Sequence, residues 1–176
     1  MLNILSQILV AGNETTTSVI AGAMLLLLQH PEQMQALQAD HALIPNCIEE
    51  ALRIESPVQG LFRTAKVDTE LSGVKIPAGA RLVVMYGSSN RDNEQFPQGD
   101  QFDIRRANAK EHLAFGEGVH YCLGAPLARL EAKLAFETLF TRLRNIRLAT
   151  DKNDFTHTPS FILRGLKTLH LEFDPT

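Results

Sequence analysis

Apolar residues dominate the first 29 positions of the chain and are interrupted by one polar stretch, at residues 11–17. This pattern predicts one long helix over residues 1–29, ending before His30 and Pro31. The apolar side chains cover nearly the whole circumference of that helix. Such a distribution is typical of a helix that is buried on all sides.

The polar interruption, Ala11 to Thr17, combines a glycine with three threonines, which are poor helix formers. The glycine alone costs about 1 kcal/mol in a helix interior. We expect a bend here, with hydroxyl groups donating hydrogen bonds back to carbonyl oxygens of the preceding turn. The alternative is a break between two short helices, with Thr15 to Thr17 capping the second.

Two further helices are predicted, a polar one over residues 32–39 and another over residues 46–55. In the second, Glu50 and Arg53 lie on one face, at positions i and i+3. An exposed pair with this spacing contributes only about 0.2 to 0.5 kcal/mol. Removing one partner of a buried pair costs about 3 to 5 kcal/mol instead. Cys47, on the same helix, is interpreted as a core residue.

The remaining parts of the chain predict small sheets and a long loop. Residues 58–90 alternate between apolar and polar and contain Ser-Gly and Pro-Ala-Gly turns, which predicts a small antiparallel sheet. Residues 91–114 have little regular pattern, and so long a segment is expected to be functional or tied down. Residues 155–174 alternate around Gly165 and predict a terminal hairpin. The expected fold class is mainly α with small antiparallel β-sheets (α+β), in a single domain over residues 1–176.

One cysteine, Cys122, lies in a glycine-rich loop over residues 115–124, directly before a predicted helix over residues 124–143. Glycine permits positive φ and close approach of the backbone, so a tight loop against a flat or bulky group is expected. A thiol near a helix N-terminus is favoured as the thiolate, the form that binds metal. The alternative is that the thiol is a small buried apolar group and the loop only a connection.

Composition and charge exclude several classes of function. The chain of 176 residues has 17 Lys and Arg against 20 Asp and Glu, so no basic stripe indicates binding to nucleic acid. Two cysteines do not suggest a disulfide framework, which favours a reducing cytoplasm. No Lys or Arg precedes the first apolar stretch, unlike a secretory signal. The longest apolar run has ten residues, about half of what a membrane span needs, so none is expected.

The order Phe, Gly, x, Gly, x, His, x, Cys, x, Gly from Phe115 to Gly124 resembles the haem-binding loop of the cytochrome P-450 monooxygenases. The resemblance implies haem b as the cofactor, with Cys122 as the iron ligand and His120 as a donor to a propionate. Phe115, Gly116 and Gly124 belong to the same cofactor-binding loop. A zinc site that includes the nearby histidines is the alternative, although a structural zinc site usually takes four ligands.

The polar interruption in the first helix is similar to the oxygen-activation motif of the same family, which has the order Ala, Gly, x, Glu, Thr. By this resemblance, Ala11 and Gly12 open space for dioxygen next to the haem. Glu14 and Thr15 then form an acid and alcohol pair that relays protons through water.

The resemblance also implies an ion cluster behind the haem, made of Glu50, Arg53 and an arginine from a Phe-Asp-x-x-Arg pattern. Arg106 fits that pattern, but Arg105 is basic too, so the third member of the cluster is left open. An arginine at the position of Arg63 binds a haem propionate in this family.

Two regions keep alternative interpretations. His112 either lies on the surface or orients the cysteine loop. Ile162 and Leu163 either reach the substrate pocket, as the tip of the terminal hairpin does in this family, or belong to a plain edge hairpin.

The resemblance runs through almost the whole chain and implies a haem-thiolate monooxygenase of the bacterial soluble type. Such an enzyme inserts one oxygen atom of dioxygen into a small hydrophobic organic substrate. Electrons from NAD(P)H are expected to arrive through a ferredoxin or a flavoprotein reductase, because the sequence has no nicotinamide or flavin motif.

Members of the family carry a large helical region before the helix that residues 1–29 resemble. We therefore expect this chain to be a carboxy-terminal portion with that region missing. An apolar helix without partners exposes more than the few hundred Å² that are usual for monomers, so self-association through residues 1–29 is expected. The alternative function is a truncated, catalytically incompetent fragment with weak or no haem binding.

Overall fold

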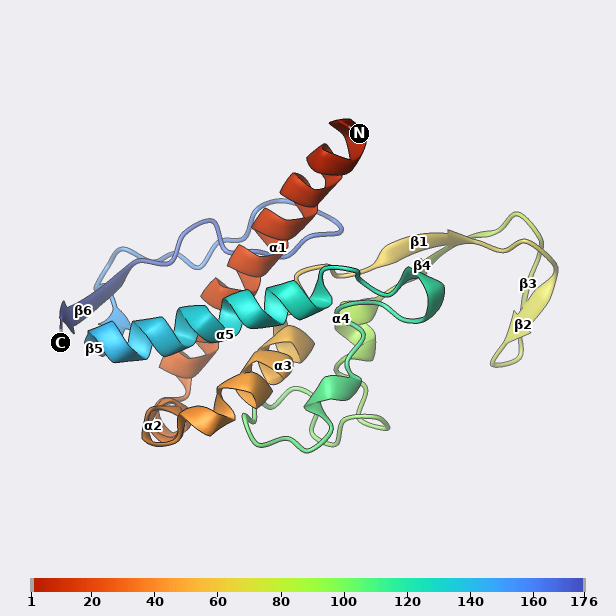
Figure 1. Cartoon of the computed structure of the whole chain (residues 1–176). Coiled ribbons are helices and arrows are strands. Elements are labelled where there is room, and N and C mark those ends of the chain that lie inside the picture. The colour runs from red at the N-terminus through yellow and green to blue at the C-terminus, as the bar shows by residue number, and fades with distance from the viewer. Residues whose placement is uncertain (1, 176) are drawn as a thin grey trace.

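The computed structural model describes residues 2–175 of the chain, and its core lies among four helices. Figure 1 shows the long helix α1 crossing behind α5, with α2 and α3 below them. The buried apolar cluster joins the C-terminal part of α1 to α2, α3 and α5. The helix bounds are Leu2–Gln29 for α1, Pro31–Ala39 for α2, Ile44–Glu55 for α3, Tyr86–Ser89 for α4 and Ala125–Arg142 for α5.

Helix α1 runs without a break through the polar stretch at residues 11–17. Thr15 Oγ1 donates to the Ala11 carbonyl oxygen at 2.7 Å, and Thr17 and Ser18 make the same kind of bond to the carbonyl four residues earlier. The predicted back-bonding is therefore confirmed. The alternative of two short helices is wrong, because each hydroxyl caps a carbonyl within the helix and does not end it.

Burial divides α1 into two parts. All of its buried residues lie from Thr16 onward, and the core includes Met24 and Leu27. The apolar residues near the start are exposed instead, with Leu2 at 83% and Leu9 at 70%. Burial on all sides is thus correct only for the C-terminal part. The expected exposed apolar patch is present at the other end, which rises away from the rest of the chain in Figure 1.

By length and composition α1 is also long and apolar enough to cross a membrane. The expectation that no membrane span is present rests on the longest uninterrupted apolar run, which is a different measure. A core helix meets the same condition, and 28% of the apolar window is buried within the structure.

Both α2 and α3 begin earlier than predicted. Helix α2 starts at Pro31 and α3 starts at Ile44, with Pro45 in its first turn. Proline is well suited to the first turn because its missing N–H has no partner there anyway. The sequence interpretation treated both prolines as breaks before the helices, whereas they lie inside them.

Residues 58–90 form a long antiparallel ribbon of two paired segments (Figure 1). The turn between its two outer strands has positive φ at both Ser72 and Gly73, as a tight hairpin turn requires. The predicted last strand does not reach residue 90, because Tyr86–Ser89 turns into helix α4 and buries Tyr86. The pairs are β1 (Leu61–Thr64) with β4 (Arg81–Val84) and β2 (Thr69–Leu71) with β3 (Val74–Ile76).

The end of the chain pairs differently from the prediction. Strand β6 (Leu171–Pro175) is antiparallel to β5 (Leu143–Leu148), not to a neighbouring part of residues 155–174. Within that segment an antiparallel bridge joins His157 to Leu166, and backbone hydrogen bonds run from Thr158 to Gly165 and from Lys167 to Thr156. The hairpin is therefore present only as this short pairing, because alternation of apolar residues reports a strand but not its partner.

The irregular segment over residues 91–114 is tied down by amide side chains. Asn46 Nδ2 donates to the carbonyl oxygens of Ile104 and Arg106 at 2.9 and 3.1 Å. The Gln33 side chain accepts from the Ile104 N–H at 2.8 Å. These bonds give a segment without regular structure a fixed path across α2 and α3, as its length led us to expect.

Candidate functional site

The cysteine loop is closed by its own backbone. The Cys122 N–H donates to the Phe115 carbonyl oxygen at 2.9 Å, and the Ala125 N–H donates to the Cys122 carbonyl at 3.2 Å. Gly116 and Gly118 have φ values of 72° and 71°, which side chains rarely adopt. The glycines therefore let the chain reverse so that the thiol lies directly before the first turn of α5.

The thiol of Cys122 is free and only partly buried. The described residues contain no group of three or more His, Cys, Asp and Glu side chains that could hold a metal ion. Within that part of the chain, the zinc interpretation has no ligand set to support it. A single thiolate fits a metal group that brings its other ligands with it, and haem iron is such a group.

A second glutamate, which the sequence interpretation missed, organises the surroundings of the loop. Glu49 on α3 is 4% exposed, and its carboxylate oxygens accept from Arg129 Nε and Nη2 at 2.6 and 3.0 Å. His112 Nε2 lies 3.1 Å from Glu49 Oε2. His112 is 7% exposed, so it does not lie on the surface, and the alternative that it orients the loop stays a prediction.

Both ends of this network touch the loop. The Arg129 guanidinium lies 4.6 Å over the ring of Phe115, and its Nη1 donates to Tyr121 Oη at 3.0 Å. At the other end, His112 Nδ1 accepts from the Ala114 N–H at 3.1 Å. The spacing between Glu49, His112 and Arg129 in the sequence gives no signal of this contact, since the pairs are 63 and 80 residues apart.

Opposing effects set the charge of Glu49. Burial alone would raise its pKa, but hydrogen bonds from His112 and Arg129 prevail and lower the pKa from 4.5 to about 2. The same contact with Glu49 raises the pKa of Arg129. This carboxylate is therefore ionised at neutral pH although it is buried.

The neighbouring Glu50 anchors a second network, which the sequence interpretation did expect. Arg53 donates to both carboxylate oxygens of Glu50 at 2.8 Å, and both side chains are fully buried. Arg106 Nε donates to Glu50 Oε1 at 3.1 Å, whereas Arg105 is exposed. The open choice between the two arginines is therefore resolved in favour of Arg106.

Arg53 also fastens the irregular segment. Its Nη1 donates to the carbonyl oxygens of Asn90 and Gly99 at 2.6 Å each, and its Nη2 donates to that of Gln101 at 3.0 Å. With these and the Glu50 contacts, the guanidinium satisfies its donors within a fully buried site. The side chain of Asn90 continues the contact by accepting from the Leu113 N–H at 2.7 Å, two residues before the loop.

The oxygen-activation motif lies on the exposed part of α1. The Glu14 side chain is exposed and Thr15 is partly buried, with the Thr15 hydroxyl bonded to the Ala11 carbonyl. No hydrogen bond or ion pair between described residues joins this motif to Cys122. One side of the motif borders an open hollow of about 480 Å³, lined by Leu9, Val10, Asn13, Glu14, Thr17, Ser18, Thr158, Gly165 and Leu166.

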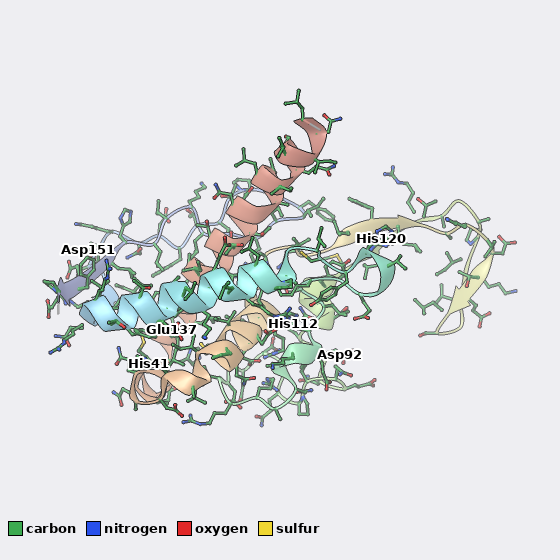
Figure 2. The ribbon with its side chains drawn as sticks, in the orientation of Figure 1. His41, Asp92, His112, His120, Glu137 and Asp151 are labelled. Atoms are coloured by element: carbon green, nitrogen blue, oxygen red, sulfur yellow. The ribbon has the colours of Figure 1, made fainter. Side chains whose placement is uncertain are left out.

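The two residues proposed to bind propionates are both exposed. Arg63 lies on β1 and its Nη1 donates to the neighbouring Phe62 carbonyl, while His120 ends the short turn Gly118–His120. Figure 2 shows His120 on the loop and His112 further down, next to α3. Neither Arg63 nor His120 has an acidic partner within the described residues, so both are free to meet an anion.

The hollow is not lined by the two residues that were considered for a pocket wall. The Ile162 carbonyl accepts from the Gln59 N–H at 2.6 Å, and Leu163 forms an isolated bridge with Val58. Both pairings are made by the backbone, so the choice between a pocket wall and a plain edge hairpin stays a prediction. Thr158, Gly165 and Leu166 of the same segment face the hollow instead.

Comparison with known proteins places this site in a family. The family model described as cytochrome P-450 matches residues 1–172, and the chain belongs to that family. The monooxygenase PikC of Streptomyces venezuelae is 42% identical over 174 residues, covering 98% of this chain and 42% of the relative. The biotin biosynthesis cytochrome P-450 of Bacillus subtilis is 42% identical over 94% of this chain and 41% of the relative.

Solved structures agree with the fold. A cytochrome P-450 of Chondromyces apiculatus is 46% identical with a TM-score of 0.90, over 97% of this chain and 44% of that one. The monooxygenase TamI, solved with tirandamycin C bound, is 38% identical with a TM-score of 0.92, over 97% of this chain and 42% of that one. The chain thus spans about two fifths of the length of the relatives it matches. Membership of the family implies a haem cofactor.

Proposed function

We propose that this chain carries the thiolate side of a haem monooxygenase site, in which Cys122 would hold the iron of haem b. The observation that carries the proposal is the free, partly exposed thiol in a glycine-shaped loop at the start of α5. Backbone amides of the loop and the ring of Phe115 would tune the sulfur by hydrogen bonding and by exclusion of water. A haem with a thiolate ligand supplies the activation of dioxygen and the cleavage of its O–O bond.

The residues on α1 are proposed to handle protons on the other side of the haem. Glu14 is exposed beside the hollow and supplies an acid group that exchanges protons with solvent. The Thr15 hydroxyl donates its only hydrogen to the Ala11 carbonyl at 2.7 Å, so its lone pairs remain free to accept one from water. Ala11 and Gly12 are small, which leaves room for dioxygen next to this pair.

Two exposed basic groups are proposed to hold the propionates. Arg63 offers a planar guanidinium that binds a carboxylate bidentately, and His120 lies two residues before the ligand. The described residues give neither group an acidic partner, which supports a role in binding an anion. These contacts would fix the haem edge relative to the loop.

The reaction proposed is the insertion of one oxygen atom of dioxygen into a small hydrophobic organic substrate. Two relatives are named 6-deoxyerythronolide B hydroxylase and biotin biosynthesis cytochrome P-450, and both names refer to organic substrates or products. We propose that electrons come from NAD(P)H through a ferredoxin or flavoprotein reductase, and that the protein works in the cytoplasm. The exposed residues around the loop, Val119 and Leu123 at 98% each, leave the thiolate side open to such a partner.

Reconstitution with haem tests this proposal. The reduced carbonyl complex of the chain should show the red-shifted Soret band of a thiolate ligand, and Cys122→Ala should lose it. Cys47→Ala is the matched control, because Cys47 is 1% exposed in the core and should leave the band in place. If the wild-type chain takes up no haem, the proposal does not hold for this chain.

A second candidate function is a fragment that keeps these elements but does not turn over. The exposed apolar start of α1 and the coverage of about two fifths of the relatives favour it. Substrate oxidation by the haem-loaded chain with a reductase would rule it out. Self-association through residues 1–29 would appear as a mass above 19.5 kDa in light scattering, and Leu5→Glu with Leu9→Glu should reduce it.

A further inference from the structure

We infer that Glu49 is a positioning residue that holds the cysteine loop from both sides with one buried carboxylate. The inference deepens the proposed haem-thiolate site and rests on it for the role of Cys122. The contacts themselves belong to the polypeptide and can be measured without haem.

The first contact holds the entry to the loop. His112 Nε2 lies 3.1 Å from Glu49 Oε2, and the same ring accepts from the Ala114 N–H through Nδ1 at 3.1 Å. An imidazole that accepts at Nδ1 carries its proton at Nε2, so it donates to the carboxylate. The carboxylate therefore fixes the tautomer and orientation of the ring, and the ring fixes the backbone one residue before Phe115.

The second contact holds the exit from the loop. Arg129 binds both oxygens of Glu49 at 2.6 and 3.0 Å, a bidentate arrangement that sets the plane of the guanidinium. That plane lies 4.6 Å over the Phe115 ring, and its third nitrogen reaches Tyr121 Oη at 3.0 Å. Phe115 and Tyr121 lie on either side of the chain reversal at residues 116–120, which leads directly into Cys122.

Both contacts depend on the negative charge at Glu49. A glutamine of the same size has one carbonyl oxygen and one amide, and its amide opposes the Arg129 donors. It therefore cannot accept from Arg129 at two points and from His112 as well. The adjacent Glu50 cannot substitute, because its carboxylate is already bound by Arg53 and Arg106 on another side of α3.

Hydrogen exchange of the 176-residue chain, read by mass spectrometry on short peptides, tests the inference. In Glu49→Gln the loop amides of Ala114, Gly116 and Cys122 should exchange roughly tenfold faster or more, since bonds to a charged group are lost. Exchange in α3 and in the core of α5 should stay within about twofold. A purely structural role would speed exchange in the helices together with the loop.

The matched control is Glu55→Gln on the same helix. Glu55 also binds an arginine, with Arg164 Nε at 3.2 Å, but that contact leads to the C-terminal segment and not to the loop. Its loop exchange should equal that of the wild type. Should Glu49→Gln fail to fold, Arg129→Lys decides the question, because the Arg129 side chain is 32% exposed and a lysine keeps the charge without the bidentate contact.

Loop exchange within about twofold of wild type in Glu49→Gln, or in Arg129→Lys where that variant decides, would overturn the inference. So would faster exchange spread evenly over loop and helices, or an equal effect from Glu55→Gln. If the chain binds no haem but loop exchange is faster in Glu49→Gln, only the proposed function is wrong. If the chain binds haem but loop exchange is unchanged in Glu49→Gln, only the positioning role of Glu49 is wrong.

Discussion

Removing Arg53 should strongly lower the free energy of unfolding, although none of its contacts involves Cys122. It is fully buried on α3 and binds Glu50 together with three carbonyl oxygens of the irregular segment. Methionine is unbranched, apolar and flexible, and it replaces the inner part of the arginine side chain without the guanidinium group. The substitution Arg53→Met therefore removes the charge and all five donors while it keeps apolar packing along the inner part of the side chain.

The size of the effect follows from what is left without a partner. Glu50 would keep Arg106 at 3.1 Å and the Asp103 N–H at 3.0 Å, but it would lose its bidentate partner. Among the described contacts, the carbonyl oxygens of Asn90 and Gly99 lose their hydrogen bonds from Arg53. The Gln101 carbonyl oxygen keeps its hydrogen bond from Arg106. Breaking a buried pair costs about 3 to 5 kcal/mol. We expect a loss at the upper part of that range, a large share of the about 5 to 15 kcal/mol that stabilises a typical domain.

Urea unfolding followed by circular dichroism measures this loss. Arg147→Met is the matched control, because Arg147 is 54% exposed and binds Glu172, which is 44% exposed, on the outer sheet. An exposed pair of this kind contributes about 0 to 1 kcal/mol, so the control should change little. Equal effects of the two substitutions, or a loss below about 1 kcal/mol for Arg53→Met, would refute the reasoning from burial.

Three further predictions concern the same elements. Burial opposes ionisation of Glu49, but its bonds to His112 and Arg129 lower its pKa from 4.5 to about 2. The ionised carboxylate therefore contributes up to about 3 kcal/mol to the free energy of unfolding, and this contribution is complete above pH 4.5 and is lost as the pH falls toward 2. Urea midpoints measured over this pH range should fall less steeply in Glu49→Gln than in the wild type. Burial, with a smaller effect of the Glu50 charge, raises the pKa of Cys47 to about 12. Iodoacetamide added to the folded chain at pH 8 should therefore label Cys122 and spare Cys47, as read from peptide maps. Equal labelling of the two cysteines would contradict the burial of Cys47. A Cβ at Gly99 would collide with the Arg91 backbone, so Gly99→Ala should lower stability by about 2 kcal/mol in urea, whereas Gly12→Ala, with open space, should not lower it.

Much of this architecture could be predicted from the sequence because the signals are local. The long first helix, the antiparallel ribbon and the helix behind the loop follow from periodicity and turn residues, and the structure confirms them. Back-bonding by Thr15 and its neighbours also follows from residue type alone. The pairing of Arg106 with Glu50 could be expected only through the resemblance to a family, which gave the order of the motifs.

The errors come from contacts that a local pattern does not encode. Strand β6 pairs with β5 across an intervening segment, and nothing in the alternation of residues 155–174 names that partner. The sequence pattern places the prolines before α2 and α3, whereas both lie in the first turn, which tolerates proline. Glu49 was overlooked because its partners, His112 and Arg129, are distant in sequence and each resembles an ordinary polar residue.

Two consecutive glutamates on α3 therefore bind two different parts of the chain around Cys122. Glu50 binds the arginines that fix the irregular segment, and Glu49 binds the two residues that flank the cysteine loop. Buried ion pairs add little stability over well-packed apolar residues of the same volume, so stability alone does not account for two of them side by side. These ion pairs fix the orientation of their partners instead, because a bidentate arginine and a hydrogen-bonded imidazole each bind a carboxylate in only a few orientations. For the proposed role of Cys122 as a haem ligand, this restriction would orient the loop that carries the thiol.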